Sequence, residues 1–465
     1  MYQYRILHND IEGRLGLALA HPLYHLIGIA VKHIPLGEFT HRVNLISAVA
    51  GALAVANLFL LLRLWLGVNL PAVLAAVTFG LCWTTWQFSS IAETYMLYIA
   101  LFLAELTVLF LYVERRQVRF LYLLALFNGL AVADHMWGSI AFVCYVVFLV
   151  VLTARREVGV KWVGVCVLLW VVGALPYEYL IIRNLIESGG LSGTLASALF
   201  GNSWRGAVLN ASLSTKLMKE NSTFILYNFS TPNALLCLAG LYALGRVAPS
   251  KGYRYVLLSL LVMFFLFAFR YTVPDRYAFF LPFYSLVCIL IGVGFKWFFA
   301  FSARRSLRYM VFVFTLVPVC IYAAAPLAAR HAGFVLPVKR TIPYRDDYKW
   351  FLRPWKTNCT GPDKFAEAVF NTVEDDAIIY ADGTTVYPLL LSQELKGTGQ
   401  TVRIVSSHPN RQNPVVLNAD TVADIVKAGP VYVVTPLPGY CPQFMLERYT
   451  FEQRGALWKL VGSGQ

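Results

Sequence analysis

Charged residues are scarce in this chain of 465 residues: they make up 14% of it, whereas hydrophobic residues make up 58%. A water-soluble protein carries roughly a quarter charged residues. The chain has too little charge and too much apolar surface to be a soluble globular protein. The composition therefore predicts a polytopic α-helical membrane protein.

Sequence signatures of common soluble enzymes are also missing. The sequence contains no P-loop, no glycine-rich dinucleotide motif after a strand and no His-Glu-x-x-His zinc motif. Two pairs of adjacent acids, Asp346-Asp347 and Asp375-Asp376, lie in polar surroundings typical of solvated turns. The sequence leaves open whether a divalent metal takes part, and nothing in it indicates a covalently bound cofactor.

Cysteine is rare outside the apolar segments. Of eight cysteines, only Cys359 and Cys441 fall in the polar C-terminal region, and the other six are small residues of apolar runs. If that region is extracytoplasmic, these two cysteines can form a disulfide; two free thiols are the alternative.

Long apolar runs fill residues 42–329 and predict a bundle of about ten transmembrane helices. Residues 1–41 contain no such run and are expected to form an amphipathic segment at the membrane interface. The expected helices span residues 43–62, 70–88, 95–113, 120–133, 137–153, 162–182, 232–247, 255–270, 277–298 and 309–329.

The net charge of +14 indicates the orientation of the bundle rather than a nucleic-acid partner. Cations gather in alternate turns, and such turns face the cytoplasm. The intervening turns, the N-terminal segment and the C-terminal region are therefore expected on the outer face. An N-terminus on that face implies a further transmembrane helix upstream. The cationic turns contain Arg115, Arg116, Arg119, Arg155, Arg156, Lys161, Arg246, Lys251, Arg254, Lys296, Arg304, Arg305 and Arg308.

Two regions outside the helices have a pattern of their own. The segment 183–231 is too long to be a simple connection between helices and is expected to form a lid over the outer end of the helix bundle. Residues 330–465 alternate between helical and strand patterns, which predicts a soluble α/β domain with a parallel sheet. In that domain Asp382-Gly383 follows a strand, where either a ligand site or a plain turn is expected. The strands are expected at 377–382, 403–407 and 431–436, and the helices at 363–373, 385–395 and 419–428.

Acids and arginines recur at the outer helix ends. A carboxylate at the edge of hydrocarbon is costly, so it usually faces a wet cavity or a partner. Asp10 is a candidate to remove a proton from an acceptor hydroxyl. Arg270 and Arg276 are candidates to bind a phosphate, because a guanidinium group presents paired hydrogen-bond donors. Helix caps and interfacial ion pairs are the alternative interpretation of the same residues. Glu105, in the middle of a predicted span, is expected to pair with a polar group on a neighbouring helix.

Several ordered motifs resemble a known family. They are HRVNLISAVAGAL (41–53), FGLCWTTWQFSSIAETYMLY (79–98), GLAVADHM (129–136, with Asp134 where the family has Asn), PDRYAFFLPFYSL (274–286) and DAIIYADGTTVYPLLLSQEL (376–395). The sequence is similar to the transmembrane protein O-mannosyltransferase-like family (TMEM260-like), within the GT-C superfamily of lipid-linked-sugar glycosyltransferases. Two departures are the missing helix before Asp10 and a contracted motif at His21-Pro22-Leu23-Tyr24.

The resemblance implies a multi-pass glycosyltransferase of a bacterial inner membrane. It would transfer a sugar, mannose in the named family, from a polyprenyl-phosphate donor to a hydroxyl of a protein or glycan at the outer face. Asp10 matches the catalytic base of the first outer loop, with Glu12 beside it. A flippase for lipid-linked saccharides and an inactive scaffold remain alternatives. The residues expected to bind substrate or lipid phosphate are His21, Arg42, Glu93, Tyr95, Asp134, His135, Arg270, Asp275 and Arg276.

Overall fold

The chain forms two compact units. The structure, a computed structural model, describes residues 1–201, 205–273, 275–301, 304–336, 338–406 and 419–463. The first unit comprises Tyr2–Phe334 and Phe351–Lys356, and the second comprises Met1, Val335–Trp350 and Thr357–Gln465.

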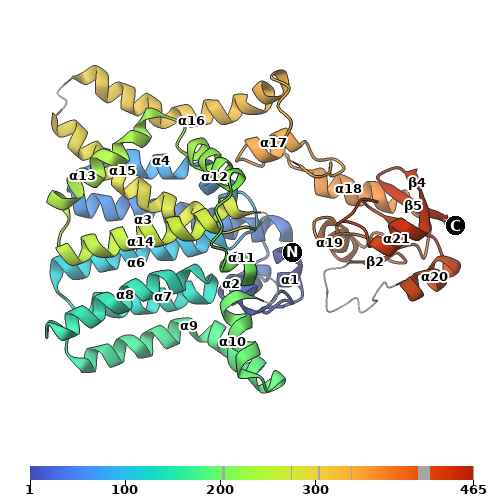
Figure 1. Ribbon diagram of the computed structural model, residues 1–465, viewed down its shortest axis with the longest axis horizontal. Helices are drawn as coiled ribbons and strands as arrows, with labels where there is room; N and C mark the ends of the chain where they lie inside the picture. The colour runs from blue at the N-terminus through green and yellow to red at the C-terminus, as the bar shows by residue number, and fades with distance from the viewer. Residues whose placement is uncertain (202–204, 274, 302–303, 337, 407–418, 464–465) are drawn as a thin grey trace. The chain divides into compact units, whose positions relative to one another are not determined.

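The first unit is a bundle of long helices lying side by side (Figure 1). In the described part of the chain, seven spans are long and apolar enough to cross a membrane, or eight if a pair bent by 106° counts as one. The chain is an integral membrane protein. The spans are α3 (Phe39–Leu66), α6 (Tyr95–Arg115), α8 (Trp137–Ala154), α9 (Val160–Ser188), α14 (Lys251–Arg270), η3 with α15 (Arg276–Phe280, Leu281–Phe301) and α16 (Arg305–His331); the bent pair is α12 (Thr215–Asn228) with η2 and α13 (Pro232–Leu235, Leu236–Val247).

Seven of the ten predicted spans are among the candidate spans of the described chain; predicted helix 232–247 is the second part of the bent pair, and the other two are shorter helices. The predicted helix 70–88 is broken into α4 (Asn69–Gly80) and α5 (Trp83–Ser89), because Cys82 between them has ψ 132° and leaves the helical region. The predicted helix 120–133 is α7 (Arg119–Asp134), whose 16 residues fall short of the roughly 20 that cross a bilayer.

Glycines allow close helix packing in this bundle. A methyl group added at Gly173 of α9 would lie 2.4 Å from the carbonyl oxygen of Leu126 in α7, and one at Gly240 of α13 would lie 1.8 Å from that of Leu290 in α15. In a lipid bilayer the hydrophobic effect does not drive helices together, and small residues promote helix association by letting the backbones approach closely. Glu105 of α6 pairs as predicted with a neighbouring helix: Asn128 of α7 donates to it at 3.3 Å.

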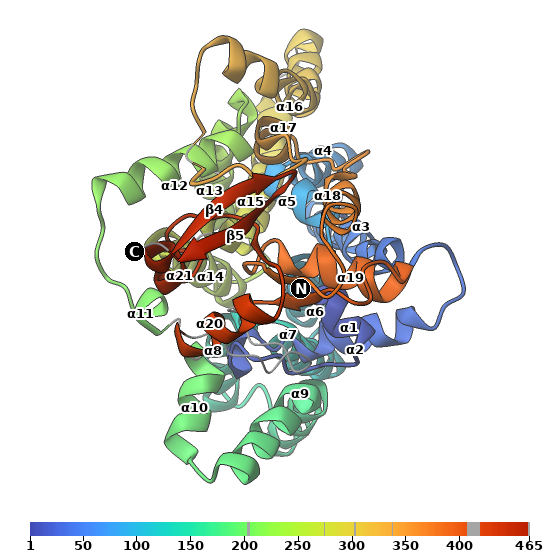
Figure 2. The same cartoon turned by 90° about the vertical axis from the view of Figure 1, so that its right-hand side faces the viewer.

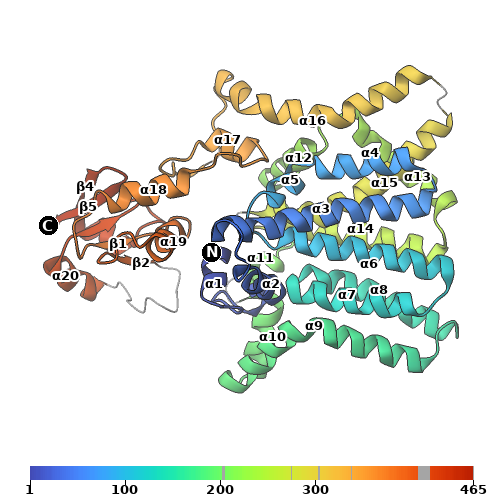
Figure 3. The ribbon, with the colours of Figure 1, turned by 180° about the vertical axis from the view of Figure 1, so that it is seen from behind.

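The two ends of the bundle differ in charge. Turns rich in arginine meet at one end, where Arg116 forms an ion pair of 2.8 Å with Glu157 and Lys296 donates to the carbonyl of Leu66 at 2.9 Å. The short N-terminal helices lie at the opposite end, here called the α1 end (Figures 1 and 3). The elements at the α1 end are α1 (Tyr2–Leu7), η1 (Leu17–Leu19), α2 (Pro22–Lys32), α10 (Leu191–Phe200) and α11 (Arg205–Val208).

The second unit is a small α/β domain (Figure 2). Its five strands have the order β2-β1-β3-β5-β4. The three parallel strands match the prediction, with Ile379 paired to Ile404 and Tyr432; residue 407 of the second predicted strand lies outside the described residues. The antiparallel β4–β5 hairpin was not predicted. The elements are α17 (Asp347–Leu352, shared with the first unit), α18 (Gly361–Phe370), β1 (Ile378–Tyr380), α19 (Val386–Lys396), β2 (Arg403–Val405), α20 (Ala419–Ala428), β3 (Val431–Val433), α21 (Gln443–Arg448), β4 (Tyr449–Arg454) and β5 (Leu457–Ser463).

The disulfide between Cys359 and Cys441 is absent from the described chain, where both are free thiols. Cys441 is buried in the core of the second unit, whereas Cys359 is exposed. Of the two alternatives that the sequence left open, the structure therefore has the free thiols.

Candidate functional site

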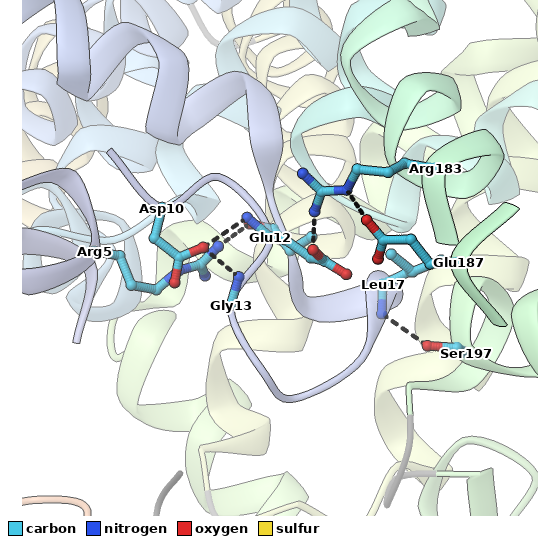
Figure 4. Close-up of polar contacts among 9 residues, drawn as sticks. Arg5, Asp10, Glu12, Gly13, Leu17, Arg183, Glu187 and Ser197 are labelled. Atoms are coloured by element: carbon cyan, nitrogen blue, oxygen red, sulfur yellow. Dashed lines mark hydrogen bonds and ion pairs between the residues drawn. The ribbon is translucent and has the colours of Figure 1, made fainter. Parts of the chain in front are cut away.

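Asp10 lies in a tight loop after α1 and is fixed by the backbone around it (Figure 4). One carboxylate oxygen, Oδ1, accepts hydrogen bonds from the backbone N–H of Glu12 at 3.1 Å and of Gly13 at 2.8 Å. The other oxygen, Oδ2, lies 4.0 Å from Nε of Arg5, and the side chain is 19% exposed. The carboxylate therefore has one oxygen held by the chain and one turned toward a cation.

The loop that carries Asp10 is clamped by two helices. Glu12 forms an ion pair with Arg183 of α9, which also lies 3.7 Å from Glu187. The backbone N–H of Leu17 donates to Ser197 Oγ of α10 at 3.0 Å (Figure 4). Residues 183–200, expected in a lid, thus hold the acidic loop in place. Glu12 is engaged in this clamp, whereas the sequence had grouped it with Asp10 as catalytic.

Arg5 connects the acidic loop to the start of α2, a role that the sequence did not reveal. Its guanidinium donates to the carbonyl oxygen of Ala20 at 2.9 Å, and only 6% of the residue is exposed. Gly13 has φ +69°, a backbone conformation that L side chains rarely adopt, so glycine suits the loop that contacts Arg5. Arg5 therefore lies between Asp10 and His21.

Three histidines gather beside this link. His21 Nδ1 hydrogen-bonds the carbonyl oxygen of Asp134 at 2.7 Å, and its ring stacks on His135 with centroids 5.1 Å apart. His25 Nδ1 hydrogen-bonds the carbonyl oxygen of His21 at 2.9 Å. Burial lowers the pKa of His21 to about 4 and lowers the pKa values of His25 and His135. All three rings are therefore neutral near pH 7.

The turn before α6 holds a buried acid. Glu93 is fixed through its backbone, because Ser47 of α3 donates to its carbonyl oxygen at 2.9 Å and accepts from its N–H at 3.0 Å. Burial, followed by the nearby charge of Asp275, raises the pKa of Glu93 to about 8. Glu93 is accordingly protonated near pH 7 and can donate a hydrogen bond.

Two further acids join this turn to other helix ends. Thr94 donates to Asp134 Oδ1 at 3.0 Å, and Tyr95 donates to Asp275 Oδ2 at 2.9 Å. The Tyr95 ring lies 5.6 Å from that of His135. The structure thus brings together six of the predicted site residues, from four separate stretches of sequence, in what is here called the polar cluster: His21, Glu93, Tyr95, Asp134, His135 and Asp275.

The predicted arginines have different surroundings. Arg270 donates to the carbonyl oxygens of Val208 at 2.6 Å and Asn210 at 2.8 Å. Arg276 pairs with Glu220 of α12. Both guanidinium groups therefore fasten residues 208–220 to the bundle. In contrast, Nε of Arg42 is buried with no hydrogen-bond partner among the described residues.

An apolar cavity of about 660 Å³ lies among α3, α4 and α5. Most of its lining is apolar and includes small residues such as Gly51 and Ala76. Thr85 and Ser89 are polar residues of the lining. Gly51 contacts Ser89 so closely that a methyl group would lie 2.2 Å from its Oγ. Ser89, at one border of the cavity, lies four residues before Glu93 in the sequence.

The sequence missed Tyr2, Arg5 and His25. The Tyr2 ring lies 5.5 Å from His25 and 6.1 Å from His21. The only available signal was polar residues spaced along short helices that cannot span a membrane. Across the described ranges, no three His, Cys, Asp or Glu side chains are grouped as a metal site requires.

The fold resembles that of solved membrane protein structures. The chain resembles two crystal structures of ArnT from Cupriavidus metallidurans. For the undecaprenyl phosphate complex the TM-score is 0.64 at 12% identity, and for the apo state it is 0.61 at 13%. Both comparisons cover 99% of this chain and 91% of ArnT. The chain has the ArnT-like GT-C fold.

The family resemblance is confirmed for the first part of the bundle. Residues 17–158 match the family model of the protein O-mannosyl-transferase TMEM260 N-terminal domain. No curated protein matches the chain. The matched range includes His21, Glu93 and Asp134, and ends before α9.

Proposed function

We propose that the protein is a membrane glycosyltransferase that transfers a sugar from a polyprenyl-phosphate donor to a hydroxyl group. The observation that carries the proposal is the junction of the Asp10 loop with the polar cluster through Arg5. The GT-C fold and the family match of residues 17–158 support it. The bound undecaprenyl phosphate of ArnT supports a polyprenyl-phosphate donor.

Asp10 is the proposed catalytic base. Its Oδ2 takes the proton of the acceptor hydroxyl while the hydroxyl oxygen attacks the anomeric carbon of the sugar. The bond from that carbon to the phosphate oxygen breaks, its electron pair stays on the phosphate, and the anomeric configuration inverts. The two backbone N–H groups on Oδ1 hold the carboxylate in one orientation during this step.

The donor is proposed to lie with its phosphate at the polar cluster and its chain in the apolar cavity. Arg42 is the proposed phosphate partner, because its buried Nε has no hydrogen-bond partner in the described chain and guanidinium binds phosphate well. Protonated Glu93 can donate a hydrogen bond to a phosphate oxygen. Arg270 and Arg276 keep a supporting role, holding residues 208–220 near the site.

The cation-rich turns support an extracytoplasmic position for the α1 end, following the positive-inside rule. Mannose is the proposed sugar and a Ser or Thr hydroxyl the proposed acceptor, on the strength of the matched family model alone.

The test is sugar transfer by purified protein in liposomes containing undecaprenyl-phosphate mannose, with a Ser/Thr-rich peptide as acceptor. The proposal expects glycosylated peptide and free undecaprenyl phosphate in equal amounts. Movement of intact donor between leaflets without product would identify a flippase instead. Neither activity, with undecaprenyl-phosphate glucose and galactosamine also tried as donors, would overturn the proposal.

A further inference from the structure

The sheet of the second unit has a point where the chain reverses its direction of winding. From β1 the chain passes to β2 on one side, and then returns to place β3 on the other side of β1. In open α/β sheets, such a reversal leaves a crevice beyond the carboxyl ends of the two strands, where ligands commonly bind. Asp382 follows β1 at this edge and Thr435 follows β3.

One arginine joins the two strand ends. Arg340 donates to Asp382 Oδ1 and to Thr435 Oγ1, both at 2.6 Å, and its guanidinium lies 4.2 Å from the ring centre of Tyr440. Asp382 also accepts from Thr385 Oγ1 at 2.8 Å. Both members of the ion pair are less than a tenth exposed. The edge therefore carries a buried ion pair, in which the charges of Arg340 and Asp382 compensate one another.

A cavity of about 700 Å³ lies beside this edge, lined by Arg340, by Thr435 and its neighbours after β3, and by residues of the β4–β5 hairpin. Its volume lies in the range of about 300–1,000 Å³ that is typical of small-molecule sites. Of the residues that line it, Arg340 alone is charged, and Asp382 neutralises it. A phosphorylated or carboxylated ligand would meet no uncompensated positive charge there. The remaining lining is aromatic, apolar and amide or hydroxyl in character, and includes Tyr344, Leu437, Gln453 and Trp458.

Two aromatic rings line the cavity from different elements. Tyr344 is 54% exposed and has φ +60°, a left-handed conformation that a bulky residue rarely adopts. Its carbonyl oxygen is pressed against Gly361, where a methyl group would lie at 2.7 Å. Trp458 of β5 faces Gln453 of β4 as a cross-strand pair. Strained backbone that leaves a large ring exposed commonly marks a ligand site.

We propose that this cavity binds a neutral saccharide. Pyranose rings have an apolar C–H face that packs against Tyr or Trp rings, and equatorial hydroxyls that bond to amide and hydroxyl groups such as those of Gln453 and Thr435. The absence of net charge in the lining favours an unphosphorylated sugar over a nucleotide. The site lies wholly within the second unit and does not depend on the transferase activity.

The experiment is saturation-transfer difference NMR on the full chain in nanodiscs, with mannobiose, chitobiose and maltose as probes. Tyr344→Asn removes a ring but suits the left-handed backbone, and Gln453→Ala removes an exposed amide, so neither should disturb folding. Glu452→Ala is the matched control, because neighbouring side chains of a strand point to opposite faces.

For at least one disaccharide, saturation should transfer from the protein to the C–H protons of the sugar. Both variants should weaken its binding about tenfold, the effect of losing roughly 1.4 kcal/mol of contact. Glu452→Ala and the polar-cluster variant Glu93→Gln should bind as the wild type does. The proposal is overturned if no saccharide gives a signal, if the signal survives in Tyr344→Asn and Gln453→Ala, or if only a Ser/Thr-rich peptide binds in a manner sensitive to these variants.

Discussion

Replacing Glu93 by Gln should remove a pH dependence from the stability of the protein. The pKa of this acid is about 8 in the folded chain against 4.5 as its ordinary value. Between these pH values the unfolded chain has lost the proton while the folded chain keeps it, so the free energy of unfolding falls as pH rises. A difference of about 3.5 in pKa, at about 1.36 kcal/mol per pH unit, corresponds to about 5 kcal/mol by pH 8.

Glutamine has the size of the protonated acid and no ionisable proton. Glu93→Gln and wild type should therefore melt together near pH 4.5, and the variant should melt at increasingly higher temperature toward pH 8. Thermal melting followed by tryptophan fluorescence in nanodiscs measures this. Glu38→Gln, an exposed acid at the start of α3, is the control and should follow the wild type. A difference between Glu93→Gln and wild type that stays constant from pH 4.5 to 8 would refute the burial argument.

Three further changes test other contacts. Arg183→Gln removes the ion pair between Arg183 and Glu12 and loosens the Asp10 loop, so sugar transfer should fall at least about tenfold with little change in melting temperature. Unchanged transfer would show that the clamp is dispensable. Asp382→Asn leaves Arg340 without its charge partner and should cost the second unit about 3–5 kcal/mol in denaturant unfolding. Burial opposes the charged form of Asp382, but hydrogen bonding and the charge of Arg340 outweigh it and hold the pKa of Asp382 below its ordinary 3.8. The difference in unfolding free energy between wild type and Asp382→Asn should therefore be complete above pH 3.8 and shrink at lower pH. A difference that does not change with pH would contradict this. Gly173→Ala should lower the melting temperature by forcing α7 and α9 apart, whereas Gly164→Ala, with nothing within 4 Å, should leave it equal or higher; equal effects would contradict the packing account.

The sequence predicted the helical bundle because long apolar runs are an unambiguous signal. It did not reveal the break at Cys82, where no proline interrupts the helix, although the residues after the break, WTTWQFS, are more polar than those before it. The β4–β5 hairpin was missed because β4 is mostly exposed and reads as a polar segment, Tyr449–Arg454. Strand patterns are recognisable chiefly where one face is buried.

Most of the polar cluster was also predictable from sequence. Acids and histidines at the ends of apolar helices stand out, and the alternation of turn charge placed them on one face. The partners of each side chain were not predictable, because they come from distant segments. Arg276 looked available for phosphate until the structure placed Glu220 against it, and the link made by Arg5 depends on how the chain folds back to Ala20.

The proposed role of Asp10 is tested most directly by a single-turnover experiment on Asp10→Asn with undecaprenyl-phosphate mannose and the peptide acceptor. Asparagine can still accept the hydrogen bonds from Glu12 and Gly13 but cannot take a proton at neutral pH. The account predicts unchanged donor binding and melting temperature, with the rate of transfer reduced by at least about a hundredfold. Transfer at the wild-type rate would contradict it.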